Sequence, residues 1–352
     1  MKTLKKQTGK SNRMNSAVVR AALFESLELR QLMSTYYMAT NGSDSAAGSN
    51  AAPFASFNKA YTVMGSGDTL IVKNGTYNQQ SVLTRSVRPP SGSSGAYTIV
   101  KAESVGGVVI DGKGTMSPIS MDGVPNSPIS YIQIDGIVFR HQGYGASMYQ
   151  VDHIKLTRDG FEDASDGNSM CVQVGKFCSY ILIEDSYAWG SGRYKFATYH
   201  ADHVIFRRLV ARFDRAVATP DPMAVFVAYA SDRVEIQNCI SIDGDHPEYW
   251  INADEYAGSF SIPSTDGPST NINIVGSMAL NVDMQFGTLT KNLTNINISN
   301  SVGWHIREGV LARDSANYDH MTLGDIYGPS RQTQTVGLNW VQGDDPNNTT
   351  SL

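Results

Sequence analysis

Residues 295–300 read Asn295-Ile296-Asn297-Ile298-Ser299-Asn300, a short run in which apolar and polar side chains alternate. The same apolar-x-apolar centre occurs in seven other segments. The first apolar residues of all eight segments are Ile132, Ile154, Ile181, Val204, Val234, Ile272, Ile296 and Met321. Successive differences between these positions are 22, 27, 23, 30, 38, 24 and 25 residues. A base period in the low twenties, lengthened by insertions, is typical of a solenoid.

Each segment is a short strand with one inward face, because the alternation has a period of two and no helical stretch separates one strand from the next. A doubly wound α/β sheet would need a helix in every connection, and an antiparallel sandwich would show hairpins without a fixed register. The position just after each strand carries small or apolar residues that suit a narrow interior. They are Ser186, Leu209, Cys239, Ser277 and Ser301.

The three cysteines are too few for a disulfide framework in a chain of 352 residues. We predict that Cys239 is a buried core thiol. Cys171 and Cys178 could pair, and no zinc site is predicted, because no CxxC or HxxxH accompanies them.

The segment from Tyr36 onward carries a distinctive series of motifs. It contains Asn41-Gly42-Ser43-Asp44, then Pro53-Phe54, then Gly67-Asp68-Thr69. It resembles the entry segment of secreted right-handed parallel β-helix proteins of the pectate-lyase-like superfamily. The resemblance implies an all-β fold, a single-stranded right-handed parallel β-helix with a short N-terminal capping helix. Apolar residues at helical spacing predict that helix over 53–64, and we expect nine to eleven coils over 35–342.

Residues 1–34 hold seven Lys/Arg and two Glu, and we expect them to be a disordered basic leader or export segment. Leu27 to Ser34 resemble the Leu-Glu-x-Arg-x-Leu-Leu-Ser motif of planctomycete surface and secreted proteins, from which Met33 departs. We therefore expect a secreted or cell-surface protein. Residues 343–352 form a polar tail, and the natural chain could continue beyond it.

The charge of the remaining chain limits its partners. Outside the leader there are 28−7=21 basic and 33−2=31 acidic residues. A nucleic-acid partner normally requires a basic surface, so none is expected. No apolar run approaches the length of a membrane span. We expect a monomer whose acidic loops could bind metal.

The two largest insertions, after Val204 and Val234, indicate the site, because long loops on consecutive coils lie side by side and form the walls of a groove. When the coils are aligned, the turns that follow the second strand of each coil should lie above one another. Their charged side chains should then form one column. Its members would be Lys195, Asp214 or Arg215, Asp243 or Asp245, Asp283 and His305.

Such a column suits β-elimination from a uronic acid, which needs a base and a cation that neutralises the sugar carboxylate. We predict Lys195 or Arg215 as the base, with Asp214 among the catalytic residues. The predicted Ca²⁺ ligands are Asp214, Asp243, Asp245 and Asp283. The predicted substrate-binding residues are Arg193, Tyr194, His246, Trp250, His305 and Arg307. The predicted function is a secreted lyase that cleaves an acidic polysaccharide.

Two alternatives stay open. A β-helix hydrolase would use Asp214 with Asp243 or Asp245 as a carboxylate pair. A non-catalytic surface solenoid would hold glycan without cleaving it. The motif series of polygalacturonase-type hydrolases is not intact here, which favours the lyase. His141, His153, His200, His203 and His320 lie beside strands or turns and are assigned no chemistry.

Overall fold

The computed structural model describes residues 33–122, 129–165, 168–213, 223–244, 258–263, 266–288, 292–311, 316–326 and 339–342. Residues 34–352 form one compact unit. Residues 1–32 of the predicted leader and the polar tail at 343–352 lie outside the described residues. In the part of the chain that the structure describes, no helix is long and apolar enough to cross a membrane.

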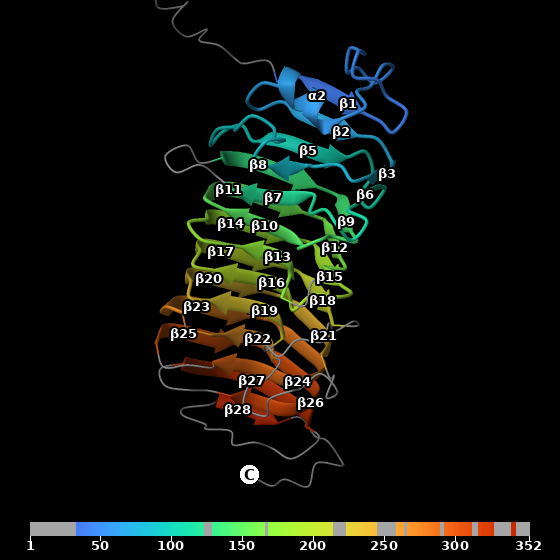
Figure 1. The fold of residues 1–352 in the computed structure, drawn as a ribbon. Coiled ribbons are helices and arrows are strands. Elements are labelled where there is room, and N and C mark those ends of the chain that lie inside the picture. The colour runs from blue at the N-terminus through green and yellow to red at the C-terminus, as the bar shows by residue number, and fades with distance from the viewer. Residues whose placement is uncertain are drawn as a thin grey trace, which may run out of the picture. The chain divides into compact units, whose positions relative to one another are not determined.

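Three parallel sheets run along the unit, and successive coils stack in the same order (Figure 1). Sheet 1 contains eleven of the described strands. They are β1 (Thr35–Met38), β2 (Thr69–Val72), β5 (Thr98–Ala102), β8 (Ile129–Asp135), β11 (Val151–Thr157), β14 (Ser179–Glu184), β17 (Asp202–Arg207), β20 (Asp232–Gln237), β23 (Ser269–Val275), β25 (Leu293–Ser299) and β27 (Ala316–Ile326).

Sheets 2 and 3 complete each coil. Sheet 2 is formed by β3 (Gly75–Asn78), β6 (Val108–Asp111), β9 (Ile137–Arg140), β12 (Gly160–Glu162), β15 (Tyr187–Trp189), β18 (Val210–Arg212), β21 (Ile240–Gly244) and the first halves of β24 (Met278–Thr288) and β26 (Val302–Leu311). Sheet 3 is formed by β4 (Leu83–Thr84), β7 (Ile119–Asp122), β10 (Ala146–Tyr149), β13 (Met170–Val174), β16 (Tyr194–Tyr199), β19 (Ala224–Tyr229), β22 (Gly258–Ile262) and the second halves of β24 and β26. A last strand, β28 (Asn339–Gln342), pairs with β27. This is the predicted right-handed parallel β-helix.

The strand register confirms seven of the eight predicted repeat positions, from Ile132 to Ile296. The eighth position, Met321, is wrong: Ile296 pairs with Ala316, whereas Thr322 pairs with Val302 in sheet 2. The reason is that β27 continues through the corner, so its second apolar-x-apolar run belongs to the next sheet.

The corner between sheets 1 and 2 is a column of residues in the left-handed backbone region. They are Gly136, Arg158, Asp185, Arg208, Asn238, Gly276 and Asn300. Glycine and asparagine adopt this conformation at the lowest cost. At Gly276 (φ +62°) a Cβ would also lie 2.3 Å from Asn238 Oδ1, so a larger residue there would require the Asn238 side chain to move.

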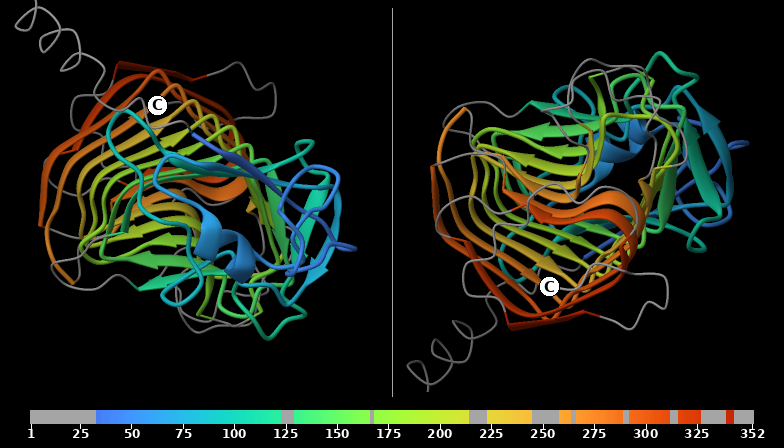
Figure 2. Two further views of the ribbon diagram at one scale, coloured as in Figure 1. Left: turned by 90° about the horizontal axis from the view of Figure 1, so that it is seen from above. Right: turned by 90° about the horizontal axis from the view of Figure 1, so that it is seen from below.

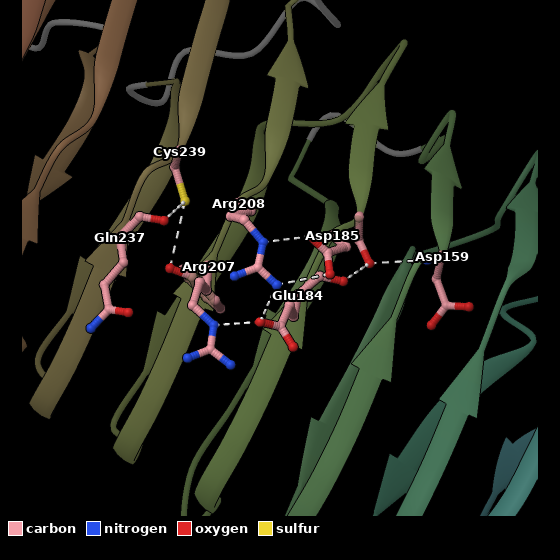
Figure 3. A network of polar contacts seen from close by, with 9 residues as sticks. Asp159, Glu184, Asp185, Arg207, Arg208, Gln237 and Cys239 are labelled. Atoms are coloured by element: carbon pink, nitrogen blue, oxygen red, sulfur yellow. Dashed lines mark hydrogen bonds and ion pairs between the residues drawn. The ribbon is translucent and has the colours of Figure 1, made fainter.

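Charged residues reinforce this corner on its outer side (Figure 3). Arg208 donates to both Asp185 oxygens, at 2.6 and 2.9 Å, and to Glu184 at 2.5 Å. Arg207 also donates to Glu184. Directly inside the corner, Asp159 is fully buried and its backbone N–H donates to Ser186 Oγ at 3.0 Å.

The interior is apolar and stacks from coil to coil. Phe196, Phe226 and Phe260 form a ladder with ring centroids 5.6 and 5.0 Å apart. The inward column predicted after sheet 1 is buried as expected, at Ser186, Leu209, Cys239, Ser277 and Ser301. All three cysteines are buried, and Cys239 is the predicted core thiol.

The N-terminal helix α2 (Phe57–Val63) is shorter than the predicted 53–64. Pro53 and Phe54 precede it in extended structure, since Phe54 bridges to Met38 of β1. Ser56 is the N-cap, and its side chain accepts the backbone N–H of Lys59 at 3.2 Å. The helix buries Phe57, Ala60 and Tyr61 at the N-terminal end of the coil, as the predicted capping role requires (Figure 2).

Candidate functional site

The long connections lie, in chain order, between strands of sheet 2 and strands of sheet 3. The two largest insertions follow β18 and β21, at the edge where sheet 2 leads into sheet 3. The segment from Pro263 to Pro268 lies at the opposite edge, between β22 and β23. Most of both insertions lies outside the described residues, so the groove that they were expected to form stays a prediction.

Side chains on the outer face of sheet 3 form an apolar patch that is separate from the core. Tyr194, Ala197, Ala224 and Val227 are buried together, and Tyr229 packs against them. Arg193 lies over this patch, with its Cζ 4.7 Å from the centre of the Tyr194 ring. Arg193 and Tyr194 thus occupy the face on which substrate binding was predicted, and their role stays a prediction.

A second cation lies at the other end of β16. The Lys176 Nζ is 5.2 Å from the centre of the Tyr199 ring, whose hydroxyl donates to Asp266. This hydrogen bond, assisted by burial and by the charge of Asp266, raises the pKa of Tyr199 to about 12. His200 also contacts Asp266, at 3.4 Å. The phenol therefore stays a hydrogen-bond donor at neutral pH.

Lys195 does not lie on this face, and its predicted solvent-facing position in the groove is wrong. The side chain has no exposed surface. In register, Lys195 stands between Cys171 and Val225, both of which belong to the hydrophobic core. Its ammonium donates to the carbonyls of Gly190 at 2.5 Å and Gly192 at 3.2 Å, and lies 4.3 Å from the centre of the Phe213 ring. This geometry gives Lys195 a structural position and no access to a polysaccharide.

The predicted charged column exists in altered form at the corner between sheets 2 and 3. Asp243, Asn281 and His305 are stacked in register, and all three have left-handed backbones. Asn281 Nδ2 donates to Asp243 Oδ1 at 3.0 Å. Asp283 is therefore not in this column, because Asn281 takes the expected place.

Asp283 is instead opposite Arg307 in the register of β24 and β26. Asp214, Arg215, Asp245, His246 and Trp250 lie outside the described residues. Among the residues that are described, no three His, Cys, Asp or Glu side chains are grouped closely enough to hold a metal ion. Because Asp214 and Asp245, two of the four predicted ligands, lie outside the described residues, Ca²⁺ binding stays a prediction.

Sequence reasoning missed a hollow of about 590 Å³ at the corner between sheets 3 and 1. It is lined by Phe177, Cys178, Ser179, His200, Ala201, Asp202, Ala230, Ser231, Asp232, Pro268 and Thr270. Ser179, Asp202, Asp232 and Thr270 are register partners on four consecutive coils. Each stands two residues before a predicted repeat position, so the alignment of the repeats already contained this row.

Beside the hollow, aromatic rings stack along the outside of the corner. Tyr131, His153, Tyr180 and His203 follow one another at centroid distances of 4.3, 4.7 and 4.5 Å. The faces of these rings therefore contact each other. The histidines were expected to cap or solvate the coils, and the stack gives two of them a packing role.

The class of the protein is defined by this architecture: three parallel sheets joined by left-handed corners form a parallel β-helix.

No protein-family model matches the sequence, and no curated protein does. Solved structures do match. The pectate lyase Pel9A is 17% identical, with 87% of this chain and 79% of that chain covered and a TM-score of 0.59. A complex of XylC with xylose is 12% identical, with 85% and 70% covered and a TM-score of 0.55. A structure described as a glycoside hydrolase is 7% identical, with 88% and 95% covered and a TM-score of 0.56. At these identities the similarity establishes the fold.

Proposed function

We propose that the chain is an exported, carbohydrate-active β-helix protein that cleaves an acidic, uronate-containing polysaccharide by β-elimination. The observation that carries the proposal is the pair of cation–tyrosine contacts on the outer face of sheet 3, Arg193 over Tyr194 and Lys176 over Tyr199. Five residue steps along β16 separate the two rings, which corresponds to about 16 Å. Each pair offers a positive charge to a sugar carboxylate beside an aromatic ring.

Three of the similar structures are described as a pectate lyase, a complex with xylose and a glycoside hydrolase, which makes a carbohydrate the favoured class of substrate. Fold likeness alone does not assign a reaction. The charge of the face adds the preference for an acidic chain, because both described cations lie at the ends of the strand that crosses its middle.

In the proposed reaction a base removes the proton at C5 of the uronate. The electron pair forms the C4–C5 double bond, the C4–oxygen bond breaks, and the leaving oxygen takes up a proton. Since Lys195 is buried, Arg215 is the remaining candidate for the base. Arg193 and Lys176 would bind and orient sugar carboxylates on either side of the reacting unit.

Ca²⁺ fits the oxygen-rich chemistry of the predicted ligands Asp214, Asp243, Asp245 and Asp283. Of these, the Asp243 carboxylate is described, and it stacks on the side-chain amide of Asn281. A bound Ca²⁺ would neutralise the carboxylate of the sugar and so make the C5 proton more acidic. Asp243 itself would hold its orientation through the hydrogen bond from Asn281.

The hydrolase reading, with Asp214 and Asp243 or Asp245 as a pair, and the binding solenoid remain the alternatives. A panel assay separates them. The protein is incubated with pectate, alginate, glycosaminoglycans and algal polyuronates while ultraviolet absorbance and reducing ends are followed. Elimination raises both signals. Reducing ends without the chromophore would favour the hydrolase, and retention of glycan with neither signal would favour the binding solenoid.

Variants test the face itself. Arg193→Ala and Lys176→Ala should each raise KM for the cleaved polyuronate about tenfold, because each removes one charged contact. Lys59→Ala is the matched control: its ammonium also lies near an aromatic ring, 6.0 Å from the centre of Phe54, but at the N-terminal end of the coil. An unchanged KM in both face variants would refute binding on this face.

A further inference from the structure

The hollow between sheets 3 and 1 has the features of a separate binding site. Its floor is one row of polar side chains, Ser179, Asp202, Asp232 and Thr270, on four consecutive coils. Parallel strands repeat about every 4.8 Å, so this row extends about 14 Å along the coil axis. A length of this order, with hydroxyl and carboxylate groups at regular spacing, suits a chain of sugar units better than a small ion.

Phe177 stands at the rim of the hollow, where 75% of its surface is exposed. Its backbone is left-handed (φ 62°), as at the other corners of the coils. The rings of Tyr180 and His203 nearby stack on each other, with centroids 4.5 Å apart. The exposed ring of Phe177 is therefore suited to packing against a ligand.

The two carboxylates in the hollow are held in place before any ligand binds. Arg233 bridges them, with Nη2 2.7 Å from Asp202 Oδ1 and Nη1 2.6 Å from Asp232 Oδ2. Thr270 and Asn271 also donate to Asp232 Oδ1. An ionised carboxylate has about four acceptor sites. Those of Asp232 are taken by Thr270, Asn271 and the side chain and backbone of Arg233. Asp202 contacts only Arg233 and His203 among the interactions described, so it can accept further hydrogen bonds. Fixing them in advance reduces the entropic cost of binding.

We propose that this hollow binds neutral sugar units of a polysaccharide. The C–H face of a pyranose ring packs on Phe177, and its hydroxyls donate to Asp202. The same carboxylates repel a uronate, so the hollow selects a sugar of different charge from the one proposed for the face of sheet 3. This inference does not depend on the proposed lyase activity, because it concerns other residues and requires no reaction.

The test is calorimetric titration of the full chain with xylose, glucose and mannose oligosaccharides, and with galacturonate and glucosamine oligosaccharides for comparison. At least one neutral series should bind. Phe177→Ala should weaken that binding tenfold or more, as is common for a central aromatic contact. Asp202→Asn should also weaken it about tenfold, because it removes a charged acceptor while its shape is kept.

Tyr144→Ala is the matched control, since it removes another highly exposed ring, 71% exposed, that does not line the hollow. Its affinity for neutral sugars should equal that of the unmodified protein. Melting temperatures of all variants check that the fold is intact. Three results would overturn the inference: no neutral series binds at millimolar concentration, Phe177→Ala binds as well as Tyr144→Ala, or only the galacturonate or glucosamine series binds through Phe177. The elimination assay has a separate readout, so the failure of one proposal leaves the other standing.

Discussion

Replacing Lys195 by methionine should destabilise the protein without acting on catalysis directly. The change keeps most of the apolar stem but removes the ammonium, which donates to the carbonyls of Gly190 and Gly192 inside the coil. A buried acceptor left without its donor costs about 1–3 kcal/mol, so two of them give roughly 2–6 kcal/mol. The loss of the cation–ring contact with Phe213 increases this destabilisation. The variant no longer buries a charge, which decreases it.

A net loss near the lower end of that range, about 3 kcal/mol, should lower the melting temperature by roughly 5–10 °C. Scanning calorimetry of the unmodified protein, Lys195→Met and Lys176→Met measures it. Lys176 is the control, because it is exposed and its substitution should leave the melting temperature within about 1 °C.

The elimination assay at a temperature well below both melting points supplies the second readout. If Lys195 has a structural position, the Lys195→Met variant should keep its kcat within a few-fold. An unchanged melting temperature together with a loss of about a hundredfold or more in kcat would refute this reasoning and restore Lys195 as the base.

Three further predictions concern pH and metal. Burial raises the pKa of Asp159 well above its usual range, so its neutral form is favoured in the folded state. The stability that Asp159 contributes therefore falls as pH rises above about 4. Asp159→Asn should raise the melting temperature at pH 8 and have no such advantage near pH 3; equal differences at both pH values would contradict this. Although burial acts in the opposite direction, hydrogen bonds from Lys113 and His141 lower the pKa of Asp111 to about 2, so the free energy of unfolding should fall by about 2 kcal/mol as pH drops from 4 toward 2; urea titrations should show a flatter profile for Asp111→Asn. Millimolar Ca²⁺ should raise the melting temperature relative to excess chelator if the site that includes Asp243 binds the ion, because the free energy of unfolding rises by about 2.7 kcal/mol at a hundredfold excess over Kd; identical melting curves would exclude a tight site.

The fold could be predicted because its signal repeats. Each strand of sheet 1 carries the same apolar-x-apolar centre, and one face of every strand must be buried, so the spacing of these centres is constrained by the stacking of coils. The prediction failed only where β27 runs through a corner, since a strand that changes sheets shows two such centres.

The candidate site could be predicted less well, and Lys195 shows why. Strict alternation would place Lys195 outward, because Phe196 points into the core. At the start of the strands of sheet 3, however, two consecutive residues point inward, as Cys171 and Val172 do in the preceding coil. A period of two cannot reveal such a local break, and a lysine in an apolar column is too rare to be expected.

The hollow was missed for a different reason. Two of its polar residues, Asp202 and Asp232, stand two residues before the repeat positions in the sequence. That their side chains face one concave surface, however, depends on Arg233 and on the segment that ends at Pro268. Those contacts join coils that are more than thirty residues apart in sequence. Pattern reasoning places residues in a row, whereas a concave surface also needs the path of the loops.

The position of α2 affects how fast the N-terminal coils separate from one another. Each strand hydrogen-bonds only to the coils before and after it, so separation of the sheets begins at a free end and proceeds one coil at a time. At the N-terminal end, Phe57, Ala60 and Tyr61 of α2 must leave the interior before the first coils can separate. Amide hydrogens of β2 should therefore exchange with solvent only as often as α2 detaches, and the helix thereby sets the rate at which this end of the protein becomes accessible to proteases in its surroundings.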